Sequence, residues 1–266
     1  MFFKRHAMFF FFLMSLVSIA NANEKIDKNN NNNNNNNELS KDAVGEIVTQ
    51  FYMANPDVFE SLLINVSNNK REKEYTAILK NVIAYKSELL DTAETPFYGD
   101  PKGDVSVILF FDYQCVFCSK LHPSFSELTK SSSNVKFFFK EWPIFSETWK
   151  ESNIAAKTGL SIWEKKGSEA YMAYHNNIFE TNHNEGQLTL ADIEKASGTF
   201  LNQTVLENPL YSEIIRKNFS LARDIGFTGT PVIIVMPSVN ATIQKTTVFL
   251  GMTDKAKISA AIDKAR

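Results

Sequence analysis

Cys115 and Cys118 are the only two cysteines in the 266-residue sequence, and two residues, Val116 and Phe117, separate them. A disulfide between them would close a loop too short to restrict the unfolded chain much, so a structural staple explains the pair poorly. The pair follows an apolar run and precedes a segment with a helical pattern. At a helix start, free N–H groups and the positive end of the helix dipole stabilise a thiolate, which is the form that attacks disulfides. The pattern therefore predicts a redox-active dithiol.

The elements that position this pair follow from the spacing of apolar residues. Residues 105–111 predict a buried strand, residues 115–130 a helix, and residues 135–139 a second buried strand. Strand, helix and strand in this order indicate a parallel pair with a right-handed crossover.

The rest of the chain after residue 96 continues this α/β pattern. A long helical stretch separates the first two strands from the end of the chain, and we place it as an insertion at about residues 146–225. Two strands and a helix close the sequence, at residues 232–236, at residues 246–250 and from Asp254. The sequence thus predicts one α/β domain over residues 96–266.

Residues 39–95 are predicted to form helices ahead of this domain. Asn55 and Pro56 are typical of an N-cap followed by proline in the first helical turn, and a longer helix is expected from about Lys70. So few helices cannot bury their apolar residues alone. Either they pack on the main domain, or residues 39–90 pair with a second copy, and homodimerisation is the sharper hypothesis.

The first 22 residues are typical of a secretory signal peptide. Lys4 and Arg5 precede an apolar stretch at residues 7–19, and small residues allow cleavage after Ala22. An uncleaved anchor is the alternative, although the apolar stretch is short for a membrane span. We therefore expect an exported protein, in a compartment where disulfides form.

Composition restricts the partners further. Residues 23–38 contain an asparagine tract, and we expect a disordered linker there; self-association through polar zippers is the alternative. The net charge of the chain is −2 and no block of basic residues stands out, which argues against nucleic acid as a partner.

Three features together resemble a known family: the strand–CxxC–helix order, the helical insertion, and Gly229-Thr230-Pro231 at the start of a late strand. With residues 110–118 and 222–231, they make the sequence similar to the thioredoxin superfamily, and within it to the DsbA-like exported thiol-disulfide oxidoreductases. Some of these carry an extra N-terminal helical dimerisation domain, which the segment beginning at Asn55 resembles. The resemblance implies a thioredoxin fold with a helical insertion, preceded by an all-helical segment.

The resemblance also implies roles for individual residues. A cis peptide bond between Thr230 and Pro231 is expected beside the cysteines, with the Thr230 backbone pairing with an extended substrate. Cys115, nearer the helix start, is expected to attack, and Cys118, one turn deeper, to resolve the mixed disulfide. Substrate contacts are expected from Thr230, Pro231 and the two residues between the cysteines, Val116 and Phe117.

Phe117 departs from the family pattern. Strongly oxidising members usually carry histidine at this position, whereas phenylalanine can donate neither charge nor a hydrogen bond to the Cys115 thiolate. The helix terminus must then do most of the stabilising. We expect a Cys115 pKa below that of a free thiol but outside the extreme acidic range, and a less oxidising disulfide than the family's strongest.

Two further residues have competing interpretations. Glu141 follows the second strand and could be a buried proton acceptor for Cys118, although a solvated carboxylate at a strand end is the more ordinary interpretation. His122 could raise thiol reactivity, but a histidine on the helix surface is the simpler one. Neither His122 nor His175 has ligand spacing to the CxxC pair, so no zinc site is expected.

The sequence and its resemblance together imply an exported, periplasmic protein disulfide oxidoreductase or isomerase. It would act on cysteines of other exported proteins, would need no metal or organic cofactor because its own disulfide is the oxidant, and would be recycled by a membrane redox partner. A competing hypothesis is a non-catalytic peptide-binding chaperone or surface protein on a thioredoxin scaffold. A third is metal delivery through the thiol pair.

Overall fold

The computed structural model describes residues 40–266, apart from the side chain of Thr199. The predicted signal peptide, its cleavage after Ala22 and the linker at residues 23–38 lie outside the described residues. The chain divides into two compact units, and the second begins at Glu60. No helix within the described part of the chain is long and apolar enough to cross a membrane.

Two helices begin the described chain. Helix α1 spans Lys41–Ala54, and the Ser40 side chain caps it by accepting a hydrogen bond from the Ala43 N–H. Helix α2 begins at Pro56, as predicted, but runs without interruption to Ala84. The separate helix expected from about Lys70 is therefore wrong. No glycine or proline occurs between residues 57 and 84, so nothing in the sequence ends the helix there.

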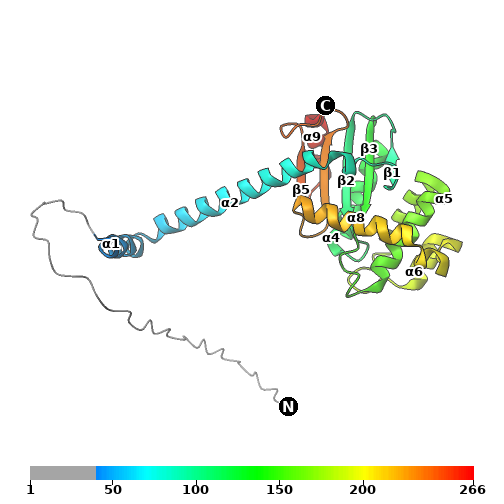
Figure 1. The fold of residues 1–266 in the computed structure, drawn as a ribbon, viewed down its shortest axis with the longest axis horizontal. Helices are drawn as coiled ribbons and strands as arrows, with labels where there is room; N and C mark the ends of the chain where they lie inside the picture. The colour runs from blue at the N-terminus through cyan, green and yellow to red at the C-terminus, as the bar shows by residue number, and fades with distance from the viewer. Residues whose placement is uncertain (1–39) are drawn as a thin grey trace, which may run out of the picture. The chain divides into compact units, whose positions relative to one another are not determined.

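A five-stranded sheet forms the centre of the second unit, in the order β1-β3-β2-β4-β5 (Figure 1). Strands β2 and β3 are parallel, as the predicted strand–helix–strand unit requires, and the other neighbouring pairs are antiparallel. The strands are β1 (Phe97–Gly99), β2 (Val105–Phe111), β3 (Val135–Glu141), β4 (Val232–Pro237) and β5 (Thr247–Leu250). The sequence did not predict β1, a strand of three residues within a turn-rich segment.

Helices pack on both faces of this sheet. Four of them follow β3 and precede β4 in the sequence, which confirms the helical insertion. The helices that follow α2 are α3 (Lys86–Leu89), α4 (Val116–Ser131), α5 (Lys150–Glu180), α6 (Leu190–Ser197), α7 (Gln203–Glu207), α8 (Pro209–Ile225) and α9 (Lys255–Ala265). A short 3-10 turn, Gly198–Phe200, follows α6. The architecture is the predicted α/β fold with a helical insertion, and a helical segment precedes it in the sequence.

Strand β2 is buried on both faces, because alternate residues of a strand point to opposite sides of the sheet. Leu109 and Phe111 pack in the cluster that contains residues of α4, α5 and α9. Ile108 and Phe110 pack in the opposite cluster, which contains residues of α2, α3 and α8. Helices on both faces therefore hold β2 in place, and the residues that follow it are positioned by a rigid element.

The C-terminal half of α2 belongs to this core. Leu79 and Val82 are buried in the cluster on the α8 face of the sheet, together with Leu89 of α3. Packing on the main domain therefore accounts for the apolar residues of this half. The apolar residues Leu62, Leu63 and others between residues 58 and 66 are exposed in the single chain.

We expect Val82→Ala to lower the free energy of unfolding by about 2 kcal/mol, because it removes two buried methyl groups and leaves a small cavity. Val239→Ala is the matched control, since Val82 is 0 % exposed and Val239 is 72 % exposed. Equilibrium unfolding in urea measures both. Equal effects of the two substitutions would show that α2 does not pack on the sheet.

Candidate active site

The dithiol lies at the N-terminus of α4, directly after β2. Cys115 is the N-cap residue of the helix and Cys118 is in its first turn. Both are reduced and buried, with 3 % and 4 % of their surfaces exposed. The first turn is fixed at its start, because the Cys115 N–H donates to the Asp112 carbonyl at 3.1 Å. The redox-active pair predicted from the sequence is therefore placed at a helix start.

Asp112 organises the loop that leads into the helix. One carboxylate oxygen, Oδ1, accepts hydrogen bonds from the Gln114 N–H and the Ser152 hydroxyl, each at 2.8 Å. The other, Oδ2, accepts from the Phe145 N–H at 2.9 Å. Burial raises the pKa of Asp112, and these three donors oppose that shift. Sequence reasoning missed this residue, although an acid between a buried strand and the cysteine pair was a usable signal.

Thr230 and Pro231 lie beside Cys115, although more than a hundred residues separate them in sequence. The peptide bond between them is cis, as the resemblance implied. The Cys115 thiol donates to the Thr230 carbonyl oxygen at 3.4 Å. The carbonyl of Pro231 accepts from the Gly251 N–H at 2.9 Å, which ties the turn to the end of β5.

The two thiols have opposite pKa shifts. The Cys115 pKa is lowered to about 6, chiefly because the Cys118 thiol donates a hydrogen bond to its sulfur. Burial opposes this shift, and the Thr230 side chain and the N–H groups of Cys118 and Phe117 add to it. Burial raises the pKa of Cys118 well above its ordinary value. The Cys118 thiol is the largest single cause, and the sequence did not predict its contribution; the two N–H groups at the helix start add to it, as expected.

The two residues between the cysteines differ in exposure. Phe117 is 52 % exposed, whereas Val116 is half-buried. Exposed aromatic surface at the dithiol is available to a partner chain. The ammonium group of Lys120 lies 5.8 Å from the centre of the Phe117 ring.

Glu141 is buried, with 1 % of its surface exposed, so a solvated strand-end carboxylate is the wrong interpretation. Its Oε1 accepts hydrogen bonds from the hydroxyl groups of Tyr113, at 3.2 Å, and Tyr171, at 2.8 Å. Burial raises its pKa well above the ordinary value, against these two hydrogen bonds. Tyr171, which helps to bury Glu141, comes from the helical insertion. The sequence pattern of β3 alone therefore could not indicate that Glu141 is buried.

His122 is also buried, with 8 % of its surface exposed, so the interpretation as a surface histidine is wrong. Its ring stacks on Phe179 of α5, with 5.0 Å between the ring centres. Burial lowers its pKa to about 4, with a smaller contribution from Lys130. His175 lies 5.6 Å from His122, ring centre to ring centre, and sequence reasoning gave it no role.

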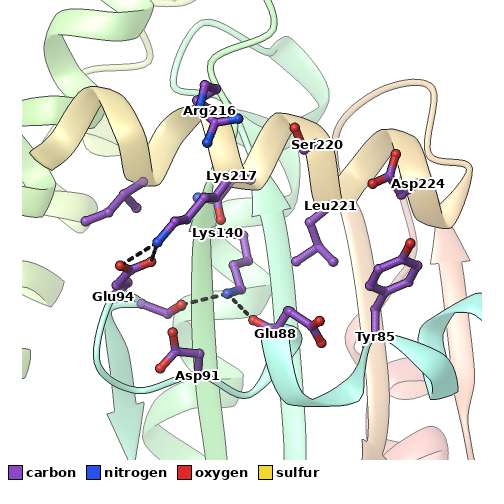
Figure 2. Close-up of a pocket in the computed structure, with 13 residues that line it drawn as sticks. Tyr85, Glu88, Asp91, Glu94, Lys140, Arg216, Lys217, Ser220, Leu221 and Asp224 are labelled. Carbon is purple, nitrogen blue, oxygen red and sulfur yellow. Dashed lines mark hydrogen bonds and ion pairs between the residues drawn. The ribbon is translucent and has the colours of Figure 1, made fainter. Parts of the chain in front are cut away.

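A hollow of about 370 Å³ lies between α8 and the segment that follows α2 (Figure 2), and no cysteine lines it. The buried Lys140 reaches into this region from β3. Its Nζ donates to the Glu88 carbonyl at 2.8 Å and to the Thr95 hydroxyl at 2.6 Å. Burial lowers the pKa of Lys140 to about 8. These bonds fasten α3 and the following turn to the sheet, which is a structural role.

Comparisons with known proteins agree with this fold. The chain matches the family model described as Thioredoxin over residues 91–247. It is similar to BcfH of Salmonella enterica Typhimurium, with 31 % sequence identity and a TM-score of 0.76, over 84 % of this chain and 95 % of that one. An 84 % share exceeds what residues 96–266 can supply, so the match includes residues of the N-terminal helical segment.

Two further solved structures are similar. One is a thioredoxin-like oxidoreductase from Silicibacter pomeroyi DSS-3, with 27 % identity and a TM-score of 0.54, over 68 % of this chain and 96 % of that one. The other is the thiol-disulfide exchange protein alpha-DsbA2 from Wolbachia pipientis, with 21 % identity and a TM-score of 0.59, over 72 % and 97 %. No curated protein matches the chain.

The pKa of Cys115 should depend on Cys118. We expect thiolate absorbance to show a Cys115 midpoint near 6 in the wild-type protein and a higher midpoint in Cys118→Ala, because the largest stabilising hydrogen bond is lost. The rate of Cys115 attack should therefore rise as the pH increases through about 6 in the wild-type protein.

Phe117→Leu is the control for this titration, because Phe117 contributes only its backbone N–H and the midpoint should stay in place. A wild-type midpoint below about 4, typical of the strongest oxidants, would contradict the role given to Phe117. An unchanged midpoint in Cys118→Ala would contradict the role given to Cys118.

Proposed function

The chain belongs to the thioredoxin family and has the fold of its DsbA-like members. From that premise we propose that it is an exported thiol-disulfide oxidoreductase, which introduces and reshuffles disulfide bonds in other exported proteins. The observation that carries the proposal is the buried dithiol at the start of α4, with Cys115 beside the cis Thr230–Pro231 bond. The pKa shifts of the two thiols agree with it, because the pKa of Cys115 is lowered and that of Cys118 is raised. One thiol is then a thiolate near neutral pH, and the other keeps its proton.

In the oxidising direction, the enzyme begins with a Cys115–Cys118 disulfide. A substrate thiolate attacks the Cys115 sulfur, the disulfide breaks, and its electron pair leaves on Cys118, which takes up a proton. A second substrate thiolate then attacks the substrate sulfur of the mixed disulfide and releases Cys115. A lowered pKa makes Cys115 a good leaving group, so the substrate gains a disulfide and the enzyme is left reduced.

In the reshuffling direction, the reduced enzyme begins the reaction. The Cys115 thiolate attacks a substrate disulfide and forms a mixed disulfide, which frees one substrate thiolate. That thiolate can attack elsewhere in the substrate and release Cys115 again. Cys118 provides the exit when this fails, because its attack on Cys115 releases the substrate in reduced form.

Substrate contacts are assigned to the surface around Cys115. Phe117 is exposed at the helix start, Val116 is half-buried beside it, and the Thr230 carbonyl lies within hydrogen-bond reach of the attacking thiol. An extended substrate segment would pair with the backbone before Pro231 and place its cysteine at Cys115. The partners proposed are exported proteins with cysteines and a membrane-bound redox protein that recycles the dithiol, in the periplasm.

We also propose that the protein forms a homodimer through residues 39–90. Side chains of this segment that are buried within the single chain cannot contact a partner, which restricts the possible interface. Leu79, Val82 and Leu89 are already buried within the single chain, so they are not available to a partner. The exposed large apolar side chains on α1 and the first part of α2 are Val44, Ile47, Val48, Phe51, Met53, Val58, Phe59, Leu62, Leu63, Ile64 and Val66. So much exposed apolar surface is typical of an association site.

Cys115→Ser should abolish disulfide transfer, because it removes the attacking sulfur. Cys118→Ser should instead accumulate covalent complexes with substrates, because nothing resolves the mixed disulfide. Recovery of activity by a reduced, unfolded enzyme that needs disulfides measures the first effect, and non-reducing gels measure the second. If wild-type protein transfers no disulfides but still binds unfolded peptides, the scaffold hypothesis replaces this one.

A chain that begins at Asn69 should be monomeric and poor at isomerisation, because it lacks the exposed apolar residues but keeps the buried part of α2. Sedimentation equilibrium gives the mass, and reshuffling of a scrambled disulfide protein gives the activity. Thiol exchange with a small disulfide is the control and should be retained, since it needs only the dithiol. An unchanged sedimentation mass would count against the pairing surface.

A further inference from the structure

A small cavity of about 10 Å³ adjoins Cys118. That volume is about one water-sized probe sphere. Its polar lining consists of Cys118 together with His122 and His175, and these are the only titratable side chains among the described residues around it. The remaining lining is apolar: Leu109, Phe111, Leu121, Phe125 and Phe179. Once Cys115 is bonded to a substrate sulfur and is no longer a thiolate, the two histidines are the bases that share this cavity with Cys118.

His175 connects this cavity to the buried carboxyl group. Its Nδ1 lies 3.4 Å from the Tyr113 hydroxyl oxygen, and that hydroxyl donates to Glu141 Oε1 at 3.2 Å. Tyr113 has a single hydroxyl proton, and it donates this proton to Glu141 Oε1. The Tyr113 oxygen is then left to accept from His175 Nδ1–H, so the free lone pair of His175 is on Nε2. The chain of hydrogen bonds has one direction, from the cavity to Glu141.

We propose that His175, Tyr113 and Glu141 form a proton relay that takes the proton of Cys118 when this thiol attacks and returns it when Cys118 leaves. The inference rests on the proposed function, because it describes one step of thiol-disulfide exchange. It gives Glu141 a path to Cys118, although no direct hydrogen bond between the two residues is present. Of the three relay residues, only His175 lines the cavity, and Tyr113 and Glu141 act through it.

The step balances as follows when Cys118 attacks a mixed disulfide on Cys115. The Cys118–Cys115 bond forms, the bond from Cys115 to the substrate sulfur breaks, and the electron pair leaves on the substrate thiolate. The Cys118 proton passes to His175 Nε2, directly or through a water in the cavity, and the Nδ1 proton of His175 passes to the Tyr113 oxygen. The Tyr113 hydroxyl proton then passes to Glu141, which ends as a neutral carboxylic acid. The reverse sequence protonates Cys118 when it is the leaving group.

The pKa values of the relay groups suit these roles. Burial raises the pKa of Glu141, which makes it a stronger base toward the raised pKa of Cys118 than an ordinary carboxylate would be. Burial lowers the pKa of His175 well below the ordinary value, with a smaller contribution from His122. The imidazole therefore passes a proton on and does not keep it.

The test separates the two thiols in time. One equivalent of the nitrobenzoate disulfide reagent DTNB is mixed rapidly with the reduced full-length protein. Attack by Cys115 releases a first thionitrobenzoate, and attack by Cys118 on the resulting mixed disulfide releases a second. The first phase reports the proposed function, and only the second phase requires the Cys118 proton to leave.

Tyr113→Phe and Glu141→Gln should slow the second phase on the order of 100-fold near neutral pH, the usual contribution of positioned acid–base groups. The first phase should change less than about twofold, because neither residue contacts Cys115. Tyr174→Phe is the matched control: it also removes a buried tyrosine hydroxyl with one hydrogen bond, to the Ala155 carbonyl at 2.8 Å. Its second phase should be close to that of the wild-type protein.

Equal second phases in Tyr113→Phe and Tyr174→Phe would overturn the relay, whereas loss of the first phase in wild-type protein would overturn the proposed function instead. A second measurement needs no variant. Nitrogen NMR of the reduced wild-type protein should find the His175 proton on Nδ1. A proton on Nε2 in its place would overturn the relay even if the tyrosine variants failed to fold.

Discussion

The burial of the Cys118 sulfur is the constraint on which the chemistry of this protein depends. A buried thiol keeps its proton because the protein interior solvates a thiolate poorly, and the Cys118 pKa is raised for that reason. A thiol that keeps its proton can donate a hydrogen bond to Cys115, and this bond is the largest cause of the lowered Cys115 pKa. The burial of one sulfur atom thus explains both the lowered pKa of Cys115 and the raised pKa of Cys118. The same burial creates the need for a route by which the second proton can leave.

The sheet and the Asp112 carboxylate hold this arrangement in place. Strand β2 is packed on both faces, so the position of the residue that follows it is fixed by the core. Asp112 then uses both carboxylate oxygens to bind the loop, α5 and the segment at Phe145. The cis turn at Thr230 and Pro231 lies beside Cys115 and is tied to Gly251. A dithiol held by three separate parts of the fold needs little rearrangement to react, which is favourable for catalysis.

The sequence predicted those parts of the fold whose signals are local. Residues 107–111 and 232–236 are continuous apolar runs, and β2 and β4 lie there. The cis bond before Pro231 followed from a family resemblance, since sequence alone does not distinguish the isomers. Strand β1 was missed because three residues carry too short a pattern, and it is a strand only because β3 pairs with it. The separate helix expected from about Lys70 is wrong because no glycine or proline occurs between residues 57 and 84 to end α2.

The burial of Glu141 and His122 was not predictable from their own segments, because residues of the helical insertion cover them. Tyr171 and Phe179 provide that cover, thirty residues or more away in sequence. The adjacent Lys140 shows what distinguishes a functional buried charge from a structural one. Consecutive strand residues face opposite sides, and Lys140 donates to a carbonyl and a hydroxyl in a region that no cysteine lines. Glu141 instead bonds to phenols, one of which contacts an imidazole beside Cys118. These partners can all transfer protons, so the chemistry of the partners, and not burial alone, indicates a functional role for Glu141.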